Sequence, residues 1–272
     1  MKKILIFSIL LPILTALPAH SQEIPDELLE DEHVREEFGI NQFTTPSIRK
    51  IFEDLKKLRP LPYDELKRVI PKETGTDRNM VAITLGFLIA DGFFAVEAEQ
   101  FLDLEPVGLS LLDHAKAIGA GTRIKSHTKA LLDHQNLQDW SSLKAQLSKT
   151  QKDVEKEMVL IRDVDLAHFI ALGGWLRAFE IGCAASLEPF DREKAAVIAK
   201  PEIVEYFVAN LETMLARTEK NKMIEDVVAT LKEIQEIVTL PEQESLSEAD
   251  VIKLQSKISP IVDKLYGKKV EA

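Results

Sequence analysis

The stretch DLAHFIALGGWLRAFEIGCAASLEP, from Asp165 to Pro189, is apolar over most of its length but carries two adjacent glycines, an arginine and a glutamate near its middle. A second stretch of the same kind, NMVAITLGFLIADGFFAVEAE from Asn79 to Glu99, has one aspartate in its centre. A helix that is apolar on nearly all sides belongs in the middle of a large bundle or in a membrane. Because charged residues in mid-helix oppose membrane insertion, the two stretches predict central helices of a soluble bundle.

The rest of the chain also has the composition and spacing of helices. Leu, Ala, Glu, Lys and Gln dominate, and apolar residues recur at intervals of three and four. We therefore expect an all-α fold, a bundle of about ten to twelve helices. Ser247, with Asp250 three residues later, predicts a capping box at the start of the last helix. The expected helices span residues 26–37, 46–58, 62–70, 77–102, 106–118, 122–135, 140–161, 164–187, 191–198, 201–218, 220–238 and 247–266.

The first 21 residues have the pattern of a secretory signal peptide. Two lysines precede a short apolar core at residues 4–17, and the small residues Ala19 and Ser21 precede Gln22. We expect cleavage before Gln22, export to the periplasm or beyond, and no stable membrane span afterwards. The alternative is an uncleaved anchor, although the apolar run is shorter than the roughly 20 residues that a membrane span needs.

The mature chain divides into three further parts: an N-terminal helical segment at 22–76, a central bundle at 77–239, and a C-terminal helix and tail at 240–272. Within the bundle, the Leu-Gly pair at 85–86 recurs at 172–173, and the Glu-Pro pair at 105–106 recurs at 188–189. This spacing suggests two duplicated halves, 77–161 and 164–238, packed through the two apolar helices. Chance similarity between helices of the same composition explains the spacing equally well.

Charge and cysteine content exclude some classes of function. Removing residues 1–21 takes away two of the 34 basic residues and none of the 45 acidic residues, so the mature net charge is 32 − 45 = −13. Such a surface repels nucleic acid and anionic lipid. The single cysteine, Cys183, lies in the apolar stretch and cannot form an intramolecular disulfide, so we expect a buried, unreactive thiol.

The glycines of the two apolar helices predict a close helix crossing at the centre of the protein. On a helical wheel, Gly174 and Gly182 lie in a narrow stripe of small residues, whereas Gly173 lies on the far side with Arg177. Small residues allow two backbones to approach closely, which compensates for the cost of glycine in a helix. The predicted close-packing residues are Gly86, Gly173, Gly174 and Gly182.

The charges in the apolar helices predict a polar cluster inside the bundle. Arg177 and Glu180 are three residues apart and share a helix face, so they can pair, and Asp91 of the other helix is a candidate third member. Such a cluster either marks a function or is a structural ion network. Beside the small-residue stripe lie His168, Trp175 and Phe179, which form either core or the wall of a ligand site.

No motif in the sequence identifies a reaction. The histidine spacings do not complete a zinc or di-iron site, and no nucleophile–base pattern appears. We therefore expect no metal and no cofactor, and a non-catalytic protein that works by contact with a protein partner in the cell envelope, as a scaffold, adaptor or helper. The alternative is a periplasmic binding protein for a small apolar or anionic ligand held near Trp175, Phe179 and Arg177. A binding protein should have a cavity at the central crossing, and a contact protein should be solid there.

Overall fold

A computed structural model describes residues 56–119, 164–217, 221–241, 244–267 and 269–270, together with positions 53, 142, 145 and 149. Within these residues the chain is mostly helical, with seven α-helices of seven residues or more and no β-strand. The predicted all-α class is therefore confirmed. The expected signal peptide and the helices expected at 26–37 and 122–135 lie outside the described residues, as do most of those expected at 46–58 and 140–161.

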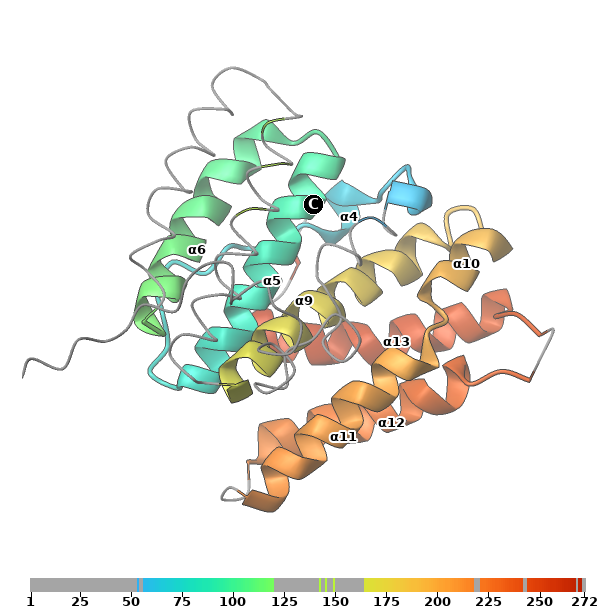
Figure 1. Ribbon diagram of the computed structural model, residues 1–272. Helices are drawn as coiled ribbons and strands as arrows, with labels where there is room; N and C mark the ends of the chain where they lie inside the picture. The colour runs from blue at the N-terminus through green and yellow to red at the C-terminus, as the bar shows by residue number, and fades with distance from the viewer. Residues whose placement is uncertain are drawn as a thin grey trace, which may run out of the picture.

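Two long apolar helices, α5 (Arg78–Glu97) and α9 (Val164–Ala185), pack side by side in the middle of the protein (Figure 1). Asp77 begins α5 because its side chain accepts hydrogen bonds from the backbone N–H groups of Asn79 and Met80. Nearly every residue of both helices is buried. Among the described helices, α5 alone is long and apolar enough to cross a membrane, and 83% of its apolar window is buried inside the fold.

The backbones of α5 and α9 touch at glycines. A Cβ atom at Gly86 would lie 2.1 Å from the carbonyl oxygen of Ile170 and 2.7 Å from the backbone nitrogen of Gly174. A Cβ atom at Gly173 would lie 2.1 Å from the carbonyl oxygen of Ile83. No side chain larger than hydrogen fits at either position without moving a helix.

The helical wheel identified only one edge of the α9 face that makes this crossing, because Gly174 of the small-residue stripe lies against Gly86. The wheel placed Gly173 far from the small-residue stripe, but Gly173 lies directly against α5, on the same side as Arg177. The ion pair that Arg177 makes with Asp91 of α5 turns this face toward α5. Gly182, by contrast, lies against α10, where its Cβ would be 2.5 Å from Cγ2 of Ile198.

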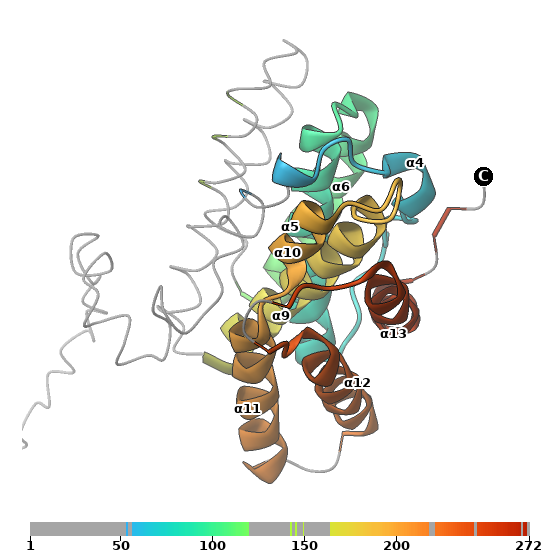
Figure 2. The ribbon, with the colours of Figure 1, turned by 90° about the vertical axis from the view of Figure 1, so that its right-hand side faces the viewer.

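The remaining elements cover the central pair on two sides. The 3-10 helix η2 (Phe101–Asp103) and helix α6 (Leu104–Ala117) pack against α5. On the α9 side lie α10 (Arg192–Ile198), the paired helices α11 (Pro201–Arg217) and α12 (Lys222–Val238), and α13 (Glu248–Tyr266), which contacts α12, α9 and α5 (Figures 1 and 2). The described part of the chain begins with η1 (Lys56–Leu58) and the short helix α4 (Tyr63–Leu66).

Two local predictions have different outcomes. The capping box at the start of α13 is confirmed, because Ser247 and Asp250 exchange the expected side-chain and backbone hydrogen bonds. The helix expected at 62–70 is wrong in extent, because α4 ends at Leu66 and Lys67 adopts an extended ψ of 144°. From there the chain runs beside the C-terminal segment, where Arg68 and Lys269 form an antiparallel bridge.

Candidate functional site

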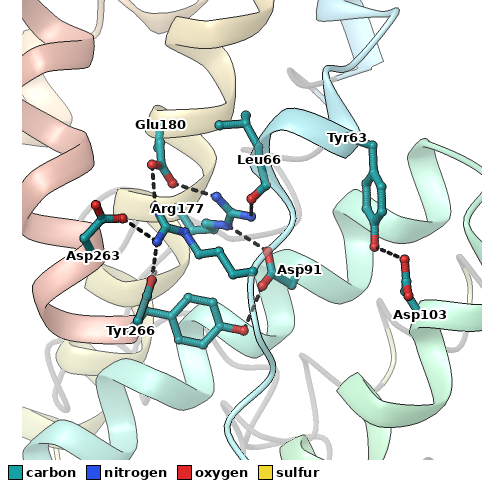
Figure 3. A network of polar contacts seen from close by, with 10 residues as sticks. Tyr63, Leu66, Asp91, Asp103, Arg177, Glu180, Asp263 and Tyr266 are labelled. Atoms are coloured by element: carbon teal, nitrogen blue, oxygen red, sulfur yellow. Dashed lines mark hydrogen bonds and ion pairs between the residues drawn. The ribbon is translucent and has the colours of Figure 1, made fainter. Parts of the chain in front are cut away.

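Arg177 of α9 is enclosed in the protein, and each of its nitrogens has a partner. Nε donates to Oδ1 of Asp91 at 2.7 Å, Nη1 donates to Oε2 of Glu180 at 2.6 Å, and Nη2 donates to the carbonyl oxygen of Leu66 at 2.7 Å. The side chains of Arg177 and Glu180 are fully buried. The structure thus brings Asp91, Arg177 and Glu180 together, as Figure 3 shows.

A second buried arginine, Arg68, extends this cluster. Its Nη2 donates to Oε1 of Glu180 at 2.6 Å, and its Nη1 donates both to Oδ1 of Asp263 at 2.6 Å and to the carbonyl oxygen of Gly267. The Glu180 carboxylate therefore bridges two guanidinium groups. The side chain of Arg68 is fully buried, and its Nε has no hydrogen-bond acceptor among the described residues.

Tyr266 at the end of α13 completes the cluster. Its hydroxyl group donates to Oδ2 of Asp91 at 2.7 Å, so both carboxylate oxygens of Asp91 accept a hydrogen bond (Figure 3). Its ring stacks on Phe87 of α5, with 4.7 Å between the ring centroids. Because α13 follows α5 by more than 150 residues in the sequence, Tyr266 and Asp91 make one of the longest-range contacts in the fold.

We call this set of side chains the buried polar network; its members are Arg68, Asp91, Arg177, Glu180 and Tyr266. Two buried arginines face two buried carboxylates, so the buried charges balance, and the half-exposed Asp263 adds a partner at the rim. Buried ions are tolerated when they are paired and hydrogen-bonded in this way. The network connects the segment after α4 to α5, α9 and α13.

The environment of the network shifts the pKa values of Arg177 and Tyr266. Burial alone would lower the pKa of Arg177, but the facing carboxylates of Asp91 and Glu180 raise that pKa above its ordinary value. Burial, with the adjacent Asp91 carboxylate, raises the pKa of the Tyr266 hydroxyl well above its ordinary value. Tyr266 therefore stays protonated at neutral pH and acts as a hydrogen-bond donor.

Sequence reasoning identified three members of the network and missed Arg68 and Tyr266. Asp91, Arg177 and Glu180 interrupt apolar helices, which makes them conspicuous. Arg68 follows a proline-containing segment that is mostly polar, and the aromatic residue at 266 lies on the ordinary apolar face of an amphipathic helix. Neither position carries a local pattern that distinguishes a buried polar partner from a surface or core residue.

A pocket of about 260 Å³ lies beside the network. Asp91 and Arg68 belong to both features, since both are network members and both line the pocket. The Asp91 side chain is 7% exposed, whereas that of Arg68 is fully buried. The pocket lies between the segment around α4, helix α5, the η2–α6 region and the C-terminal segment. Its lining residues are Tyr63, Lys67, Arg68, Ile70, Asp91, Phe94, Asp103, Val107 and Val270.

The pocket combines aromatic and aliphatic walls with a few polar groups. The ring of Tyr63 lies 4.7 Å from the ring of Phe94, and its hydroxyl donates to Oδ2 of Asp103 at 2.9 Å (Figure 3). Burial and the Asp103 carboxylate raise the pKa of Tyr63 above its ordinary value, so this hydroxyl also stays protonated. The guanidinium carbon of Arg177 lies 5.5 Å from the centroid of the Phe94 ring. Arg177 is therefore next to a wall residue of the pocket but is not itself part of the lining.

The residues that sequence analysis assigned to core or ligand wall lie on a different face of α9. Trp175 stacks on Phe179, with 4.9 Å between centroids, and contacts Phe207 of α11 at 5.4 Å. His168 hydrogen-bonds the hydroxyl of Tyr206, also in α11. These side chains pack the interface between α9 and α11, whereas Arg177 points to α5. Trp175 and Arg177 therefore contact different neighbouring helices.

The described residues that could serve in catalysis are engaged in structural contacts. Ser110 and His114 of α6 form a buried pair, with 3.3 Å between Oγ and Nδ1, but the serine hydroxyl donates to the carbonyl oxygen of Pro71 and Nδ1 lies 2.8 Å from the Ser110 carbonyl oxygen. Cys183 is a free, buried thiol whose pKa is raised by burial and by the nearby Glu180, so it is not an activated nucleophile. Burial lowers the pKa of His168, which pairs with a tyrosine and not with a nucleophile. In the same part of the chain, no group of three or more His, Cys, Asp or Glu side chains is placed to hold a metal ion.

Comparison with known proteins adds no further assignment. No protein-family model matches the chain, and neither a curated protein nor a solved structure shows significant similarity to it.

Proposed function

We propose that this chain is an exported helical protein that works by non-catalytic contact in the cell envelope, as a scaffold, adaptor or helper. The pocket beside Asp91 is the proposed contact site, where an anchoring side chain of a protein partner inserts. The observation that carries this proposal is the position of the pocket relative to the crossing of α5 and α9. The α5–α9 crossing is closed by glycine-to-backbone contacts, and the pocket lies to one side of it.

The size and surroundings of the pocket support a protein partner. Pockets for small molecules typically measure about 300–1,000 Å³, whereas about 260 Å³ suits one large side chain. Partner side chains that fill such pockets carry most of the binding energy in many protein interfaces. Leu102, which precedes the lining residue Asp103, is 88% exposed, and the lining residue Val270 is 38% exposed. Exposed aliphatic groups at a pocket are suited to further apolar contact.

A small-molecule binder is the second candidate. The pocket has convergent polar groups in Tyr63 and Asp103 between apolar walls, which is the usual composition of a ligand site. The ligand would lie in this pocket and not near Trp175 and Phe179.

Export and the finer organisation of the fold belong to the same proposal. The pattern of residues 1–21 supports a signal peptide cleaved before Gln22, with no stable membrane span in the mature chain. We further propose ten to twelve helices in two duplicated halves. Support comes from the recurring residue pairs and from the direct packing of α5 on α9, the two helices that would correspond in such halves.

Sequencing the N-terminus of the protein from its source cell tests the export proposal. We expect the mature chain to begin at or near Gln22. An intact Met1 in the membrane fraction would contradict cleavage.

Capture of partners from the native cell envelope tests the contact proposal. Leu102→Asp places a charge at an exposed position next in sequence to the lining residue Asp103, so it should abolish capture of the specific partner without unfolding the protein. The matched control is Ile252→Asp, a change of the same kind at a position on α13 that is 53% exposed and outside the pocket. Equal capture by the two variants would contradict the proposed site. A small molecule that co-purifies with the native protein and is lost in Asp103→Asn would favour the second candidate.

A further inference from the structure

One wall of the pocket belongs to the C-terminal segment of the chain. Helix α13 ends at Tyr266, and Gly267 turns the chain with a positive φ of 115° that favours glycine. The chain then rises from α13 toward α4 (Figure 2), and Val270 reaches the pocket lining. Val270 thus contributes to the same pocket as Tyr63, Phe94 and Asp103.

The two ends of this segment are held very differently. At its base, Tyr266 is buried in the polar network, and the Gly267 carbonyl accepts a hydrogen bond from Arg68. Farther on, the attachment among described residues is a single antiparallel bridge, with the Val270 N–H donating to the Lys67 carbonyl oxygen at 3.0 Å. One such hydrogen bond contributes little net stability because water competes for both groups. The outer part can therefore detach while the base stays fixed.

We propose that Lys269 and Val270, which follow the turn at Gly267, act as a strap that closes one side of the pocket and must detach before a partner binds. This inference rests on the proposed function of the pocket as a contact site. The partner that fits is an extended peptide segment with an aliphatic side chain. That side chain takes the place of the Val270 side chain in the pocket. A backbone N–H of the peptide donates to the Lys67 carbonyl oxygen in place of the Val270 N–H.

The chemistry of the freed site favours this kind of partner. Detachment exposes an apolar wall and an unpaired backbone carbonyl on an extended stretch of chain, since Lys67 has left the helical conformation. A peptide that adds to such an edge gains backbone hydrogen bonds and places alternate side chains into pockets. Val69, two residues after Lys67, is 64% exposed and offers an apolar side chain on the same stretch. The strap acts as an intramolecular competitor, favoured by its high effective concentration.

Thiol labelling measures whether the strap covers the pocket. The test uses Val107→Cys, a lining position that is 3% exposed, in the full chain and in a chain that ends at Gly267. The native Cys183, which is fully buried and outside the pocket lining, is the control within the same molecule. Maleimide modification of each cysteine is followed by mass spectrometry of peptides.

We expect removal of the strap to raise the labelling rate at position 107 by about tenfold, the scale set by one hydrogen bond and one side-chain contact, and to leave Cys183 unchanged. Val270→Asp in the full chain should raise the rate at position 107 in the same direction, because a charge is unfavourable against the apolar wall. An unchanged rate at position 107, or equal acceleration of both thiols, would overturn the strap.

A peptide probe tests the class of partner. The hexapeptide GKKVEA, which is the chain's own C-terminal sequence, should slow labelling at position 107 when added at millimolar concentration to the chain that ends at Gly267. The peptide GKKDEA is the control and should have no effect. Protection by both peptides, or by neither, would overturn the assignment to an aliphatic peptide. The labelling and capture experiments can disagree. If labelling shows that the strap covers the pocket, but Leu102→Asp and Ile252→Asp capture the partner equally, the strap is retained and the proposed function is rejected.

Discussion

Among the described residues, Arg177 is the largest residue whose side chain is fully buried. Taking an arginine out of water is costly, and the cost is offset only when every donor finds an acceptor and a negative charge lies close. Two carboxylates and one backbone carbonyl meet these conditions here. The contribution of Arg177 to the fold therefore depends on its partners and not on the arginine alone.

Variants of the Arg177–Asp91 pair test this dependence. Arg177→Met and Asp91→Asn should each lower the free energy of unfolding by about 3–5 kcal/mol, because each leaves a buried group without its partner. The double variant should cost less than the sum of the two. Urea unfolding of all four proteins measures the coupling, and strict additivity would mean that the two residues do not interact. The control is Arg217→Met, which breaks an exposed pair with Asp165 and should cost at most about 1 kcal/mol.

Tyr266 predicts a dependence of stability on alkaline pH. Its pKa in the folded protein is raised, so its hydrogen bond to Asp91 stabilises fully below the unfolded pKa of about 10 and is lost as the pH rises beyond it. Tyr266→Phe should lower the free energy of unfolding by about 1.5–3 kcal/mol at pH 7. The difference from wild type should stay constant to about pH 9 and narrow above about pH 10. Denaturant unfolding from pH 7 to 11 checks this, and a widening gap would contradict the assigned role.

The chemistry of single residues predicted part of the site. A charge inside an apolar helix must find a partner, and this requirement alone brings Asp91 and Arg177 into one cluster. Arg68 could not be found in this way, because it lies in a polar segment and its partners Glu180, Asp263 and Gly267 lie more than 100 residues later in the sequence. The pocket was also beyond reach, since its walls come from four separate parts of the chain.

At the scale of elements, the crossing of α5 and α9 determines the arrangement of the bundle. Two helices whose backbones touch exclude side chains between them, so their relative position is fixed by backbone atoms and not by adjustable side chains. The neighbouring helices then pack on the outer faces of the pair. Glycine in mid-helix costs roughly 1 kcal/mol relative to alanine, and the closeness of the contact explains why alanine is nevertheless unsuitable here.

Alanine substitutions at the crossing reverse the usual helix preference. Gly86→Ala and Gly173→Ala should each lower the free energy of unfolding by about 1–3 kcal/mol, because the added Cβ meets a carbonyl oxygen of the facing helix. Gly75→Ala is the matched control. A Cβ there meets nothing within 4 Å, so little change is expected. Thermal unfolding compares the three variants, and equal melting temperatures would show that the helices separate easily.

Helix positions were predictable because they depend on local spacing and caps. The expected 201–218, 220–238 and 247–266 agree closely with the observed Pro201–Arg217, Lys222–Val238 and Glu248–Tyr266. The expected helix at 62–70 failed because a tertiary pairing with the C-terminal segment extends the chain after Leu66. The face of α9 that meets α5 also depends on a tertiary contact, the ion pair between Arg177 and Asp91, and the stripe of small residues revealed only one edge of it.

At the scale of the whole molecule, the buried polar network links parts of the chain that are remote in sequence. Arg68 lies before the central pair, and Tyr266 lies at the end of the last helix. Arg68 contacts the carboxylate of Glu180, and Tyr266 contacts that of Asp91. Each of these carboxylates also binds Arg177. Early and late segments are therefore joined through the centre of the fold, and opening of one segment removes partners from the others.

This linkage predicts cooperative opening. In the wild type, amide protons of α5, α9 and the last turn of α13 should exchange with similar opening free energies. Arg68→Met removes the link between α9 and the end of α13, so the last turn of α13 should exchange faster than α5 does. Hydrogen exchange followed by mass spectrometry resolves these helices. Uniform acceleration in both would indicate that Arg68 contributes to overall stability and not to the linkage.

The apolar character of α5 has a further consequence during synthesis. Glu97 ends α5 and Ala185 ends α9, so the partner that covers α5 is complete only 185 − 97 = 88 residues later. At about 5–20 residues per second, this delay lasts roughly 4–18 s. During that interval α5 is a helix of membrane-spanning length and composition without its cover. Because a carboxylate opposes entry into lipid, we expect Asp91 to disfavour membrane insertion of the nascent chain, in addition to binding Arg177 in the folded protein. Replacing Asp91 with leucine should therefore shift newly made chains toward the membrane fraction before any loss of folded stability is felt.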